Sequence, residues 1–512
     1  MDSKAIQHVE ELESSPSHDA QARAADLVPE TPTAKKNWRS YIWDSLDKSP
    51  EERRFVFKLD CALLTFGCLG KDVSRRQERP NCLFANGDNE GYFIKYLDQA
   101  NLNNAFVSGM KEDLNLYGNQ LNYMQTCYSA GYVIGGLPTN MILTRVRPSI
   151  FIPCMELLWT ICTMASSRAS SAHQFYAIRF FVGKFSPRRR LFESALYPGM
   201  IYIIGSWYRS DELAKRSCIF QAAYPIGTMF SGYLMAAVYH LEGVGGLRGW
   251  QWLYIMDGVI SLPIALAGFF MIPDFPDITR AWYFTPQDIA LARKRIQLEG
   301  RATRQPYTRA KFWKILTSWH IWCLIPLYVC WNNGGASGQP VFAQFLKDST
   351  SPKYTVPQIN NYPTSTYGVQ IFCTLVFAWT SDSVLKGRRW PSIIIGGMFN
   401  IVCYTSLWIW NIPNGWRWTC YILMGVGAAL AGIIMSWAHE ICSADNEERA
   451  MVTGGMNQMA YVIQIWLPLI VWQQVHAPRY AAGFATVLFI GGPGMVGLAL
   501  LTLWFHTREK KR

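Results

Sequence analysis

Apolar runs that are long enough to cross a membrane recur along almost the whole chain of 512 residues. A helix that spans about 30 Å of hydrocarbon needs roughly 20 mostly apolar residues. Inside lipid every backbone polar group needs an internal partner, which a helix supplies by itself. We therefore predict an all-α membrane protein with twelve transmembrane helices. The first lies between 58 and 110, and the others lie near 121–143, 149–167, 173–207, 214–240, 250–272, 318–346, 362–380, 390–410, 417–438, 451–473 and 481–505.

Composition excludes several other classes of protein. Charged residues make up 16% of the chain, whereas about 25% is usual in soluble domains. The net charge is +12, but the Lys and Arg residues lie between the apolar runs and form no single stripe for nucleic acid. The 13 Cys residues are scattered without the Cys/His spacing of a metal site. A P-loop, a nucleophile elbow and an HExxH motif are all missing, so we expect no enzyme, cofactor or bound metal.

Positive charge alternates between the loops that join the apolar runs. The longest loop, 273–316, is rich in Lys and Arg, and so are alternate loops on either side of it. The positive-inside rule predicts that this middle loop and both termini are cytosolic. A long loop between two groups of six helices is typical of parallel-repeat transporters. The predicted divisions are a disordered tail 1–54, a six-helix bundle 55–272, the middle loop 273–316, a six-helix bundle 317–506 and a tail 507–512.

Two polar inserts interrupt otherwise apolar helices. Residues 71–91 divide the first predicted helix, and residues 184–190 place three Arg and a Pro inside the fourth. Charged groups at mid-membrane cost several kcal/mol, of the order of 3 kcal/mol each on the insertion scale. Both inserts begin with a Lys that follows a Gly, and a splice-donor sequence can encode this Gly-Lys pair. We predict that mature transcripts encode a form without 71–91. The alternative is that the insert is a genuine loop that faces a cavity. Sequencing of the mature transcripts distinguishes the two.

Two loops one half-repeat apart carry similar polar motifs. The loop after the second helix holds Asn140 and Arg145, near a Gly and two Pro residues. The equivalent loop of the second half holds Asp382, Arg388 and Arg389. An Arg at a helix end can bind terminal carbonyls or pair with acids of the other half. We interpret the pair of loops as a cytosolic gate, with a simple stop-transfer charge cluster as the alternative.

Four segments, in this order, carry a resemblance to a known family. They are 96–105 (YLDQANLNNA), 136–140 (GLPTN), 193–199 (ESALYPG) and 250–258 (WQWLYIMDG). The chain resembles the major facilitator superfamily and, within it, the anion:cation symporter family, in the fungal group of allantoate-permease and pantothenate-transporter relatives. The resemblance covers about residues 55–505. It departs from the family at the two inserts and at Gln99, where many members carry Arg.

The resemblance implies a function. It implies two six-helix bundles that rock about a midplane cavity, and a monomer in the plasma membrane. The expected activity is proton-coupled uptake of a small organic anion, a vitamin such as pantothenate or a ureide such as allantoate. The expected partners are that anion, the proton gradient and the lipid bilayer. Two alternatives stay open: an exporter of a secondary metabolite with the same fold, and a nutrient sensor that does not transport.

Polar side chains crowd the first helix. Asp98, Asn101 and Asn104 recur at i, i+3 spacing and so share one face, and Gln99 lies beside them. Polar groups inside a membrane either find partners or line water. We expect this face to line the cavity, with Asp98 able to exchange a proton. The alternative is a set of hydrogen bonds that joins the helix to its neighbours.

The fourth helix carries Arg179 and Glu193, which lie seven residues apart once the insert is left out. Two helical turns place them on one face. We predict that Arg179 contacts the solute anion and that Glu193 carries the coupling proton. The alternative is that the two side chains only neutralise each other. Further candidates for the cavity are Asn332 and Asn333, beside a Gly pair in the seventh helix, together with Gln221 and Gln458.

Overall fold

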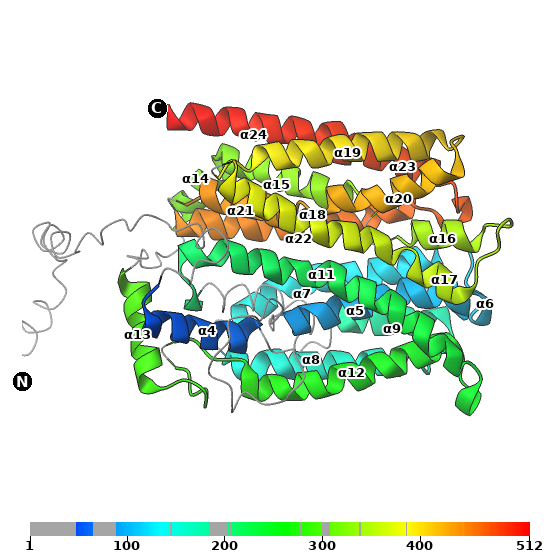
Figure 1. Ribbon diagram of the computed structural model, residues 1–512, viewed down its shortest axis with the longest axis horizontal. Coiled ribbons are helices and arrows are strands. Elements are labelled where there is room, and N and C mark those ends of the chain that lie inside the picture. The colour runs from blue at the N-terminus through cyan, green and yellow to red at the C-terminus, as the bar shows by residue number, and fades with distance from the viewer. Residues whose placement is uncertain are drawn as a thin grey trace, which may run out of the picture. The chain divides into compact units, whose positions relative to one another are not determined.

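The computed structural model describes residues 48–64, 89–143, 146–183, 203, 206–276, 278–298, 308–336, 339–385, 387–443 and 445–511. It separates Met1–Arg53 from a second unit, Arg54–Arg512, and the following description concerns the second unit. Every described secondary-structure element is helical. The long helices lie side by side with their axes roughly aligned (Figure 1). This arrangement confirms the predicted all-α class.

Besides α4, which is described below, six helices or helix parts lie among the described residues of the first half. Helix α5 packs against α11 and α12, α8 packs against α12, and α7 packs against α9. The 3₁₀ segments η4 (Tyr239–Leu241) and η5 (Val244–Gly246) join α11 to α12. The bounds of the helices are α5 Asn89–Ala105, α7 Gln120–Leu143, α8 Pro148–Ser166, α9 Ala172–Gly183, α11 Ser210–Val238 and α12 Gly249–Met271, and α5 continues through the π-helical turn η2 (Phe106–Met110) into α6 (Lys111–Asp113).

The second half repeats this design with more interrupted helices. After α13 (Pro286–Leu298) and α14 (Arg309–Thr317), the seventh predicted span divides into α15 (Trp319–Asn333) and α16 (Val341–Lys347). It breaks at Gly334, where the chain lies against the backbone of Gly491 and leaves no room for a Cβ. The remaining elements are α17 Val356–Asn361, α18 Thr364–Ser383, α19 Trp390–Ile409, α20 Asn414–Ala428, α21 Ala431–Ile441, α22 Asn446–Val471, η6 Gln474–His476, α23 Ala481–Phe489, η7 Ile490–Gly494 and α24 Met495–Lys510.

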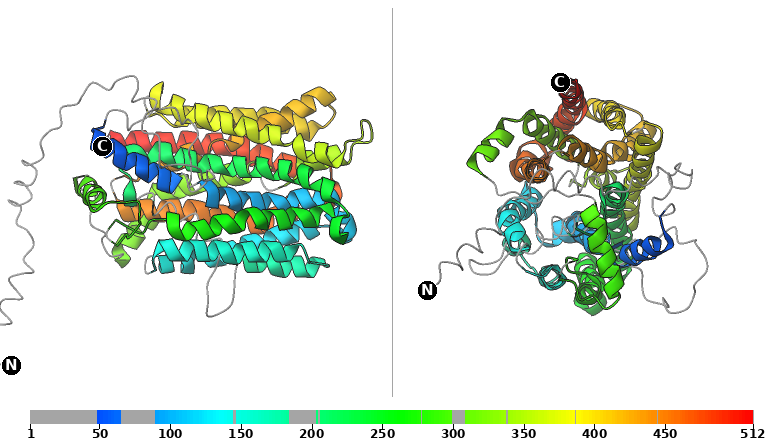
Figure 2. Two further views of the ribbon diagram at one scale, coloured as in Figure 1. Left: turned by 60° about the horizontal axis from the view of Figure 1, so that its bottom comes forward. Right: turned by 90° about the vertical axis from the view of Figure 1, so that its left-hand side faces the viewer.

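The two halves lie side by side. Helix α7 of the first half packs along α22 of the second, and α11 packs along α18. The end-on view shows the cyan-to-green helices of the first half below the yellow-to-red helices of the second (Figure 2, right). We name the two ends of this bundle by their helices. The α13 end carries α13 and α14, and the α6 end carries α6, α16 and α17 (Figure 1).

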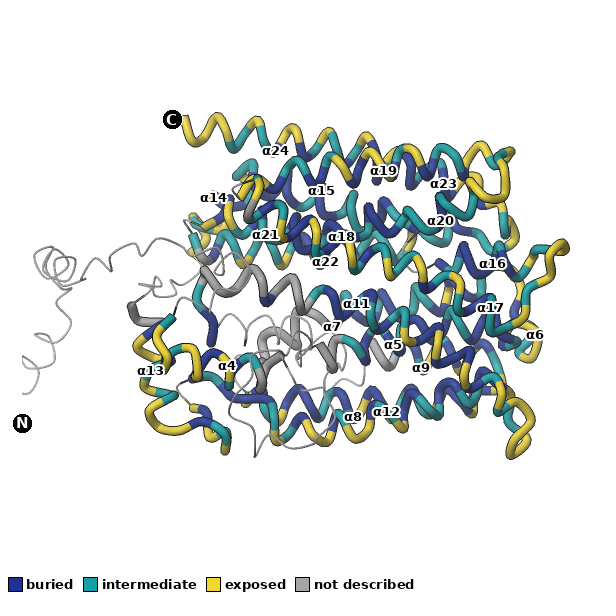
Figure 3. Tube along the Cα trace, in the orientation of Figure 1, coloured by how far each residue is buried: buried dark blue, intermediate teal, exposed yellow. Residues whose placement is uncertain are grey.

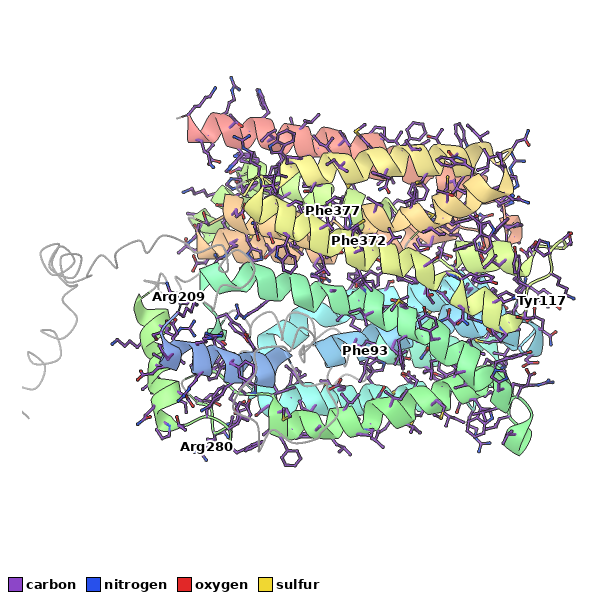
Figure 4. All side chains as sticks on the ribbon, in the orientation of Figure 1. Phe93, Tyr117, Arg209, Arg280, Phe372 and Phe377 are labelled. Carbon is purple, nitrogen blue, oxygen red and sulfur yellow. The ribbon has the colours of Figure 1, made fainter. Side chains whose placement is uncertain are left out.

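Large apolar side chains cover the outside of the bundle. Exposed residues recur along the outward faces of α8, α12 and α24 (Figure 3). Phe270 is 72% exposed and Phe372 is 67% exposed. Figure 4 shows Phe372 on α18, whereas Arg209 and Arg280 lie at the α13 end and Tyr117 lies at the α6 end. Such an apolar surface is unfavourable in water and suits lipid.

Five helical stretches of the described residues are long and apolar enough to cross a membrane, which is fewer than the predicted spans. Helices such as α7 and α22 carry many Asn and Gln residues that turn toward the interior, and these lower the mean hydropathy. Length and composition alone therefore miss helices that carry many polar side chains. The five are Pro148–Ser166, Gly249–Met271, Trp390–Ile409, Asn414–Ile441 and Ala481–Lys510.

The first predicted helix consists of two described pieces. Helix α4 (Pro50–Leu64) begins inside the predicted tail 1–54, and α5 begins at Asn89, so residues 89–91 of the predicted insert are helical. At the α13 end, α4 is held by an ion pair between Asp60 and Arg216, with 2.7 Å between Oδ1 and Nε. The rest of the first insert and all of 184–190 lie outside the described residues. The spliced form therefore stays a prediction.

Candidate functional site

A cavity of about 320 Å³ lies between the two halves. Its walls come from α5, α7, α9 and α11 on one side and from α15, α18, α20 and α22 on the other. Among the described lining residues the charged ones are Lys95 and Arg179, and none is Asp or Glu. Asn, Gln and Tyr side chains supply most of the remaining polar lining. The cavity thus offers two positive charges and many neutral hydrogen-bonding groups.

Lys95 is a cavity cation that the sequence analysis missed. It lies on α5 one helical turn before Gln99, and it is only 1% exposed. Its Nζ lies 4.7 Å from the centre of the Tyr132 ring, a distance that suits a cation–π contact. Many family members carry Arg at the position of Gln99, as the resemblance implies. A positive charge is therefore present on the same face, one turn earlier.

Arg179 lies on α9, is buried, and also lines the cavity. Besides the cavity it faces three groups of the first half, since its guanidinium lies near the Tyr254 hydroxyl and near the carboxyls of Asp98 and Asp257. Glu193, its predicted partner, lies outside the described residues. Arg179 is thus placed between the cavity and a pair of buried acids.

Asp98 is buried and does not line the cavity, so for this residue the alternative of helix contacts holds and the expectation of cavity lining does not. The Trp159 indole N–H donates to Asp98 Oδ2, and the Thr163 hydroxyl donates to the same oxygen over 2.6 Å. These donors from α8 hold the carboxyl inside the first half. Asp257 of α12 lies against both Asp98 and Asn101. Sequence reasoning quoted Asp257 only as part of a motif, although an acid inside an apolar helix is itself a signal.

The other polar residues of α5 divide between the cavity and helix contacts. Gln99 lines the cavity and donates to the Tyr128 hydroxyl. Asn104 lines it too and donates to Ser231 of α11 over 2.7 Å. Ser231 in turn donates to Asn101 over 2.6 Å, and Asn101 is fully buried away from the cavity. The expectation of a cavity face thus holds for Asn104, and the alternative of helix contacts describes Asn101.

The remaining predicted cavity residues fall into two groups, those that line the cavity and those that contact neighbouring helices. Asn332 lines the cavity and accepts a 2.6 Å hydrogen bond from Gln464, and Gln221 lines it as well. Asn333 does not, because its amide donates to the carbonyls of Val329 and Ala460 over 3.1 and 3.3 Å. Gln458 donates to the Val133 carbonyl over 2.8 Å and so joins the two halves. Asn333 and Gln458 are therefore corrected from cavity lining to helix contacts.

The predicted gating loops are only partly described. Arg389 pairs with Asp382 over 2.5 Å and with Glu440 over 2.7 Å, all within the second half. Arg388 is exposed. Arg145 and the side chain of Asn140 lie outside the described residues, so the pairing between the two loops stays a prediction.

Polar contacts between the halves gather at the α6 end. Lys347 and Glu112 form an ion pair over 2.7 Å, and Asn360 donates to Ser108 over 2.9 Å. Asn122 of α7 donates to the carbonyl of Trp472 over 2.7 Å. These bonds join the two halves at the α6 end.

A bundle of two helical halves with a polar cavity between them defines a membrane transporter. A family model described as the Major Facilitator Superfamily matches residues 91–468. The chain therefore belongs to the major facilitator superfamily, whose members are transporters and not enzymes.

Curated relatives and solved structures agree with this assignment. The chain is 34% identical to the pantothenate transporter liz1 of Schizosaccharomyces pombe over 90% of its own length and 84% of that protein. It is 30% identical to the pantothenate transporter FEN2 of Saccharomyces cerevisiae, over 91% of its own length and 87% of that protein. A bacterial homologue of the human lysosomal transporter Spinster matches the fold with a TM-score of 0.56, at 13% identity over 82% of this chain and 94% of that one.

Proposed function

We propose that this transporter takes up a small carboxylate, with pantothenate as the first candidate. One observation carries the proposal: the charged residues among the described lining of the cavity are Lys95 and Arg179, and none of the described lining residues is Asp or Glu. Both side chains attract an anion, and Arg can bind a carboxylate through two parallel hydrogen bonds. The two relatives named above are pantothenate transporters, and pantothenate is a carboxylate that fits this charge.

We also propose that uptake is coupled to protons through Asp98. Asp98 and Asp257 are buried side by side, and two adjacent carboxyls do not both carry a charge. Arg179 then balances the one charge that remains. When Arg179 turns to a carboxylate in the cavity, Asp98 loses its cation, and a proton restores neutrality. Among the described residues, other titratable groups that face the pair are Cys162 of α8, near Asp98, and Tyr254 of α12.

The orientation and assembly in the membrane are part of the same proposal. The Lys- and Arg-rich segment 273–316 supports a cytosolic α13 end. The contacts at the α6 end then close the cavity toward the outside. Plasma membrane location and a monomeric state are expected from the family resemblance. Cysteine labelling at residues 300 and 510 tests the orientation, and labelling from outside would contradict it.

Transport by purified protein in lipid vesicles tests the function. With an inward proton gradient, the vesicles should concentrate labelled pantothenate, and a protonophore should abolish the accumulation. Allantoate in the same assay distinguishes a vitamin from a ureide. Growth of cells that lack their own pantothenate permease gives an independent measurement. Accumulation of neither solute, or export from the cells, would contradict the proposal.

A further inference from the structure

A continuous chain of side-chain hydrogen bonds runs from the α6 end into the cavity. Tyr480 donates to Gln344, Gln344 to Gln474 over 2.5 Å, and Gln474 to Gln339 over 3.1 Å. Gln339 then donates to Gln125 over 2.7 Å, and Gln125 donates to Asn103 over 3.0 Å. We call these six residues the amide chain. Every donor in it points toward the cavity, so each bond polarises and strengthens the next one.

The amide chain crosses from one half to the other at a single position. Gln125 of α7 belongs to the first half, and Gln339, just before α16, belongs to the second. Next to this crossing, Gln474 donates to Asn122 of α7 over 3.3 Å, and its backbone N–H donates to Asn119 over 3.2 Å. Opening the α6 end requires the halves to separate, which breaks the Gln125–Gln339 bond. The chain is therefore part of what closes this end.

The inner members of the amide chain also line the cavity. Asn103, Gln125 and Gln339 do so, whereas Gln344, Gln474 and Tyr480 do not. A solute in the cavity can thus reach the bond that joins the halves. Gln125 Oε1 accepts its hydrogen bond from Gln339. Insertion of a solute group between Gln125 and Gln339 breaks this bond inside a partly buried site, which is unfavourable unless the solute restores the lost hydrogen bonds to both amides.

We propose that an amide or ureido group of the solute replaces Gln339 at Gln125, so that the solute itself bridges the halves and favours closure of the α6 end. An amide offers both an N–H for Gln125 Oε1 and a carbonyl for the Gln339 amide, whereas a plain carboxylate offers acceptors only. The solute class is therefore a carboxylate that also carries an amide or ureido group. This inference rests on the proposed uptake of a carboxylate, because Lys95 and Arg179 would hold the other end of the solute.

Pantothenate and hexanoate distinguish the two chemical groups, since both are carboxylates and only pantothenate carries an amide. In vesicle uptake by the full chain, Gln125→Leu and Gln339→Leu should each raise the half-saturating concentration of pantothenate about tenfold. Inhibition of that uptake by hexanoate should change less than about twofold. Gln474→Leu serves as the matched control, because Gln474 is in the chain but not in the cavity. Gln474→Leu should leave unchanged the ratio between the half-saturating concentration of pantothenate and the inhibitory concentration of hexanoate.

Hydrogen–deuterium exchange of Val341–Lys347, the residues of α16, measures closure without any transport. Pantothenate should slow this exchange in the wild-type protein, and hexanoate should not. All three Leu variants should speed the exchange when no solute is present. Equal protection by hexanoate, or wild-type exchange in the Gln125 and Gln339 variants, would overturn the inference. A wild-type protein that takes up no carboxylate would instead refute the proposed function, while the exchange in the variants would still test the closure.

Discussion

The two halves of this transporter contribute different chemistry to one cavity. Among the described lining residues, the first half supplies both charges, Lys95 and Arg179, and the second half supplies neutral side chains such as Asn332 and Gln464. The first half also buries Asp98 and Asp257 behind that wall. The proposed function assigns the binding of charge and its coupling to a proton to the first half, whereas the neutral side chains of the second half shape the cavity.

Replacement of Arg179 should have the largest effect on uptake. Arg179→Ala removes a cavity cation and leaves the buried acids without their counter-charge, so uptake should fall roughly 100-fold. Arg179→Lys keeps the charge but loses the two parallel hydrogen bonds, and should lower affinity without abolishing uptake. Labelled uptake, normalised to the amount of protein at the membrane, measures both. Normal uptake by the Ala variant would remove Arg179 from the site.

Replacement of Lys95 compares the halves directly. Lys95→Met keeps the length of the side chain and removes its charge, so the half-saturating concentration of the anion should rise about thirtyfold. Asn332→Ala is the counterpart in the second half, and should raise it only about threefold because a neutral hydrogen bond is weaker. Concentration-dependent uptake gives both numbers. Equal effects in the two halves would contradict a division by charge.

Neutralising Asp98 should separate coupling from binding. Asp98→Asn cannot take up a proton, so accumulation driven by a proton gradient should fall about tenfold. Exchange of internal for external solute needs no net proton movement and should change less than about twofold. Glu193→Gln tests the acid that the sequence analysis proposed for this role. Loss of gradient-driven accumulation in Glu193→Gln, with Asp98→Asn unchanged, would transfer the role to Glu193.

The sequence predicted the architecture well, because membrane thickness fixes the length of an apolar run. Five of the candidate residues that it named line the cavity, namely Gln99, Asn104, Arg179, Gln221 and Asn332. It could not decide which way a polar side chain points around a helix, since neighbouring helices settle that. Asp98 turned inward because α8 offers it two donors.

Long-range contacts were beyond the sequence for a second reason. The amide chain joins Gln125 to Gln339 and Gln344 to Gln474, which are far apart in the chain and carry no motif. Lys95 was overlooked because a single Lys near the start of a helix is usually an end-of-span residue. Its position one helical turn before Gln99 could have indicated that it shares the polar face of that helix.

The ion pairs at the α13 end extend the comparison of the halves to stability. Arg216 is fully buried and binds Asp60 through two hydrogen bonds of 2.7 and 2.9 Å. Arg389 binds Asp382 and Glu440, whose side chains are 33% and 47% exposed. Arg216→Ala should therefore destabilise the protein by about 3 kcal/mol. Arg389→Ala should cost about 1 kcal/mol, because water solvates the acids that remain.

Thermal unfolding of the purified protein compares these two variants. The midpoint should fall more for Arg216→Ala than for Arg389→Ala, and Arg388→Ala, at an exposed neighbouring residue, serves as the control with no change. A larger loss for Arg389→Ala would show that the second half, and not the first, depends more on its buried charge.

The smallest effect should come from the contact between α4 and α13. Lys58 donates to Asp288 over 2.8 Å, and Thr285 donates to the same carboxyl. Burial by itself raises the pKa of Asp288, but these hydrogen bonds outweigh it and lower the pKa below the usual value. A lowered pKa in the folded state means that the contact stabilises the protein above the unfolded pKa of about 4 and is lost as pH falls through the lower, folded pKa.

Lys58→Met should therefore weaken the contact between α4 and α13 at neutral pH. Acid should weaken the same contact in the wild-type protein. The Lys58 side chain is 42% exposed, so water screens the pair and the change should be about 0.5 kcal/mol. Spin labels at Arg54 and Lys294 report the distance between α4 and α13. In the wild-type protein that distance should be more broadly distributed near pH 3 than at neutral pH, and in Lys58→Met it should already be slightly broader than in the wild type at neutral pH. Uptake should change less than about twofold, since neither residue lines the cavity. A narrow distribution in the variant at neutral pH would show that Phe55 and the aromatic residues around it hold α4 without the ion pair.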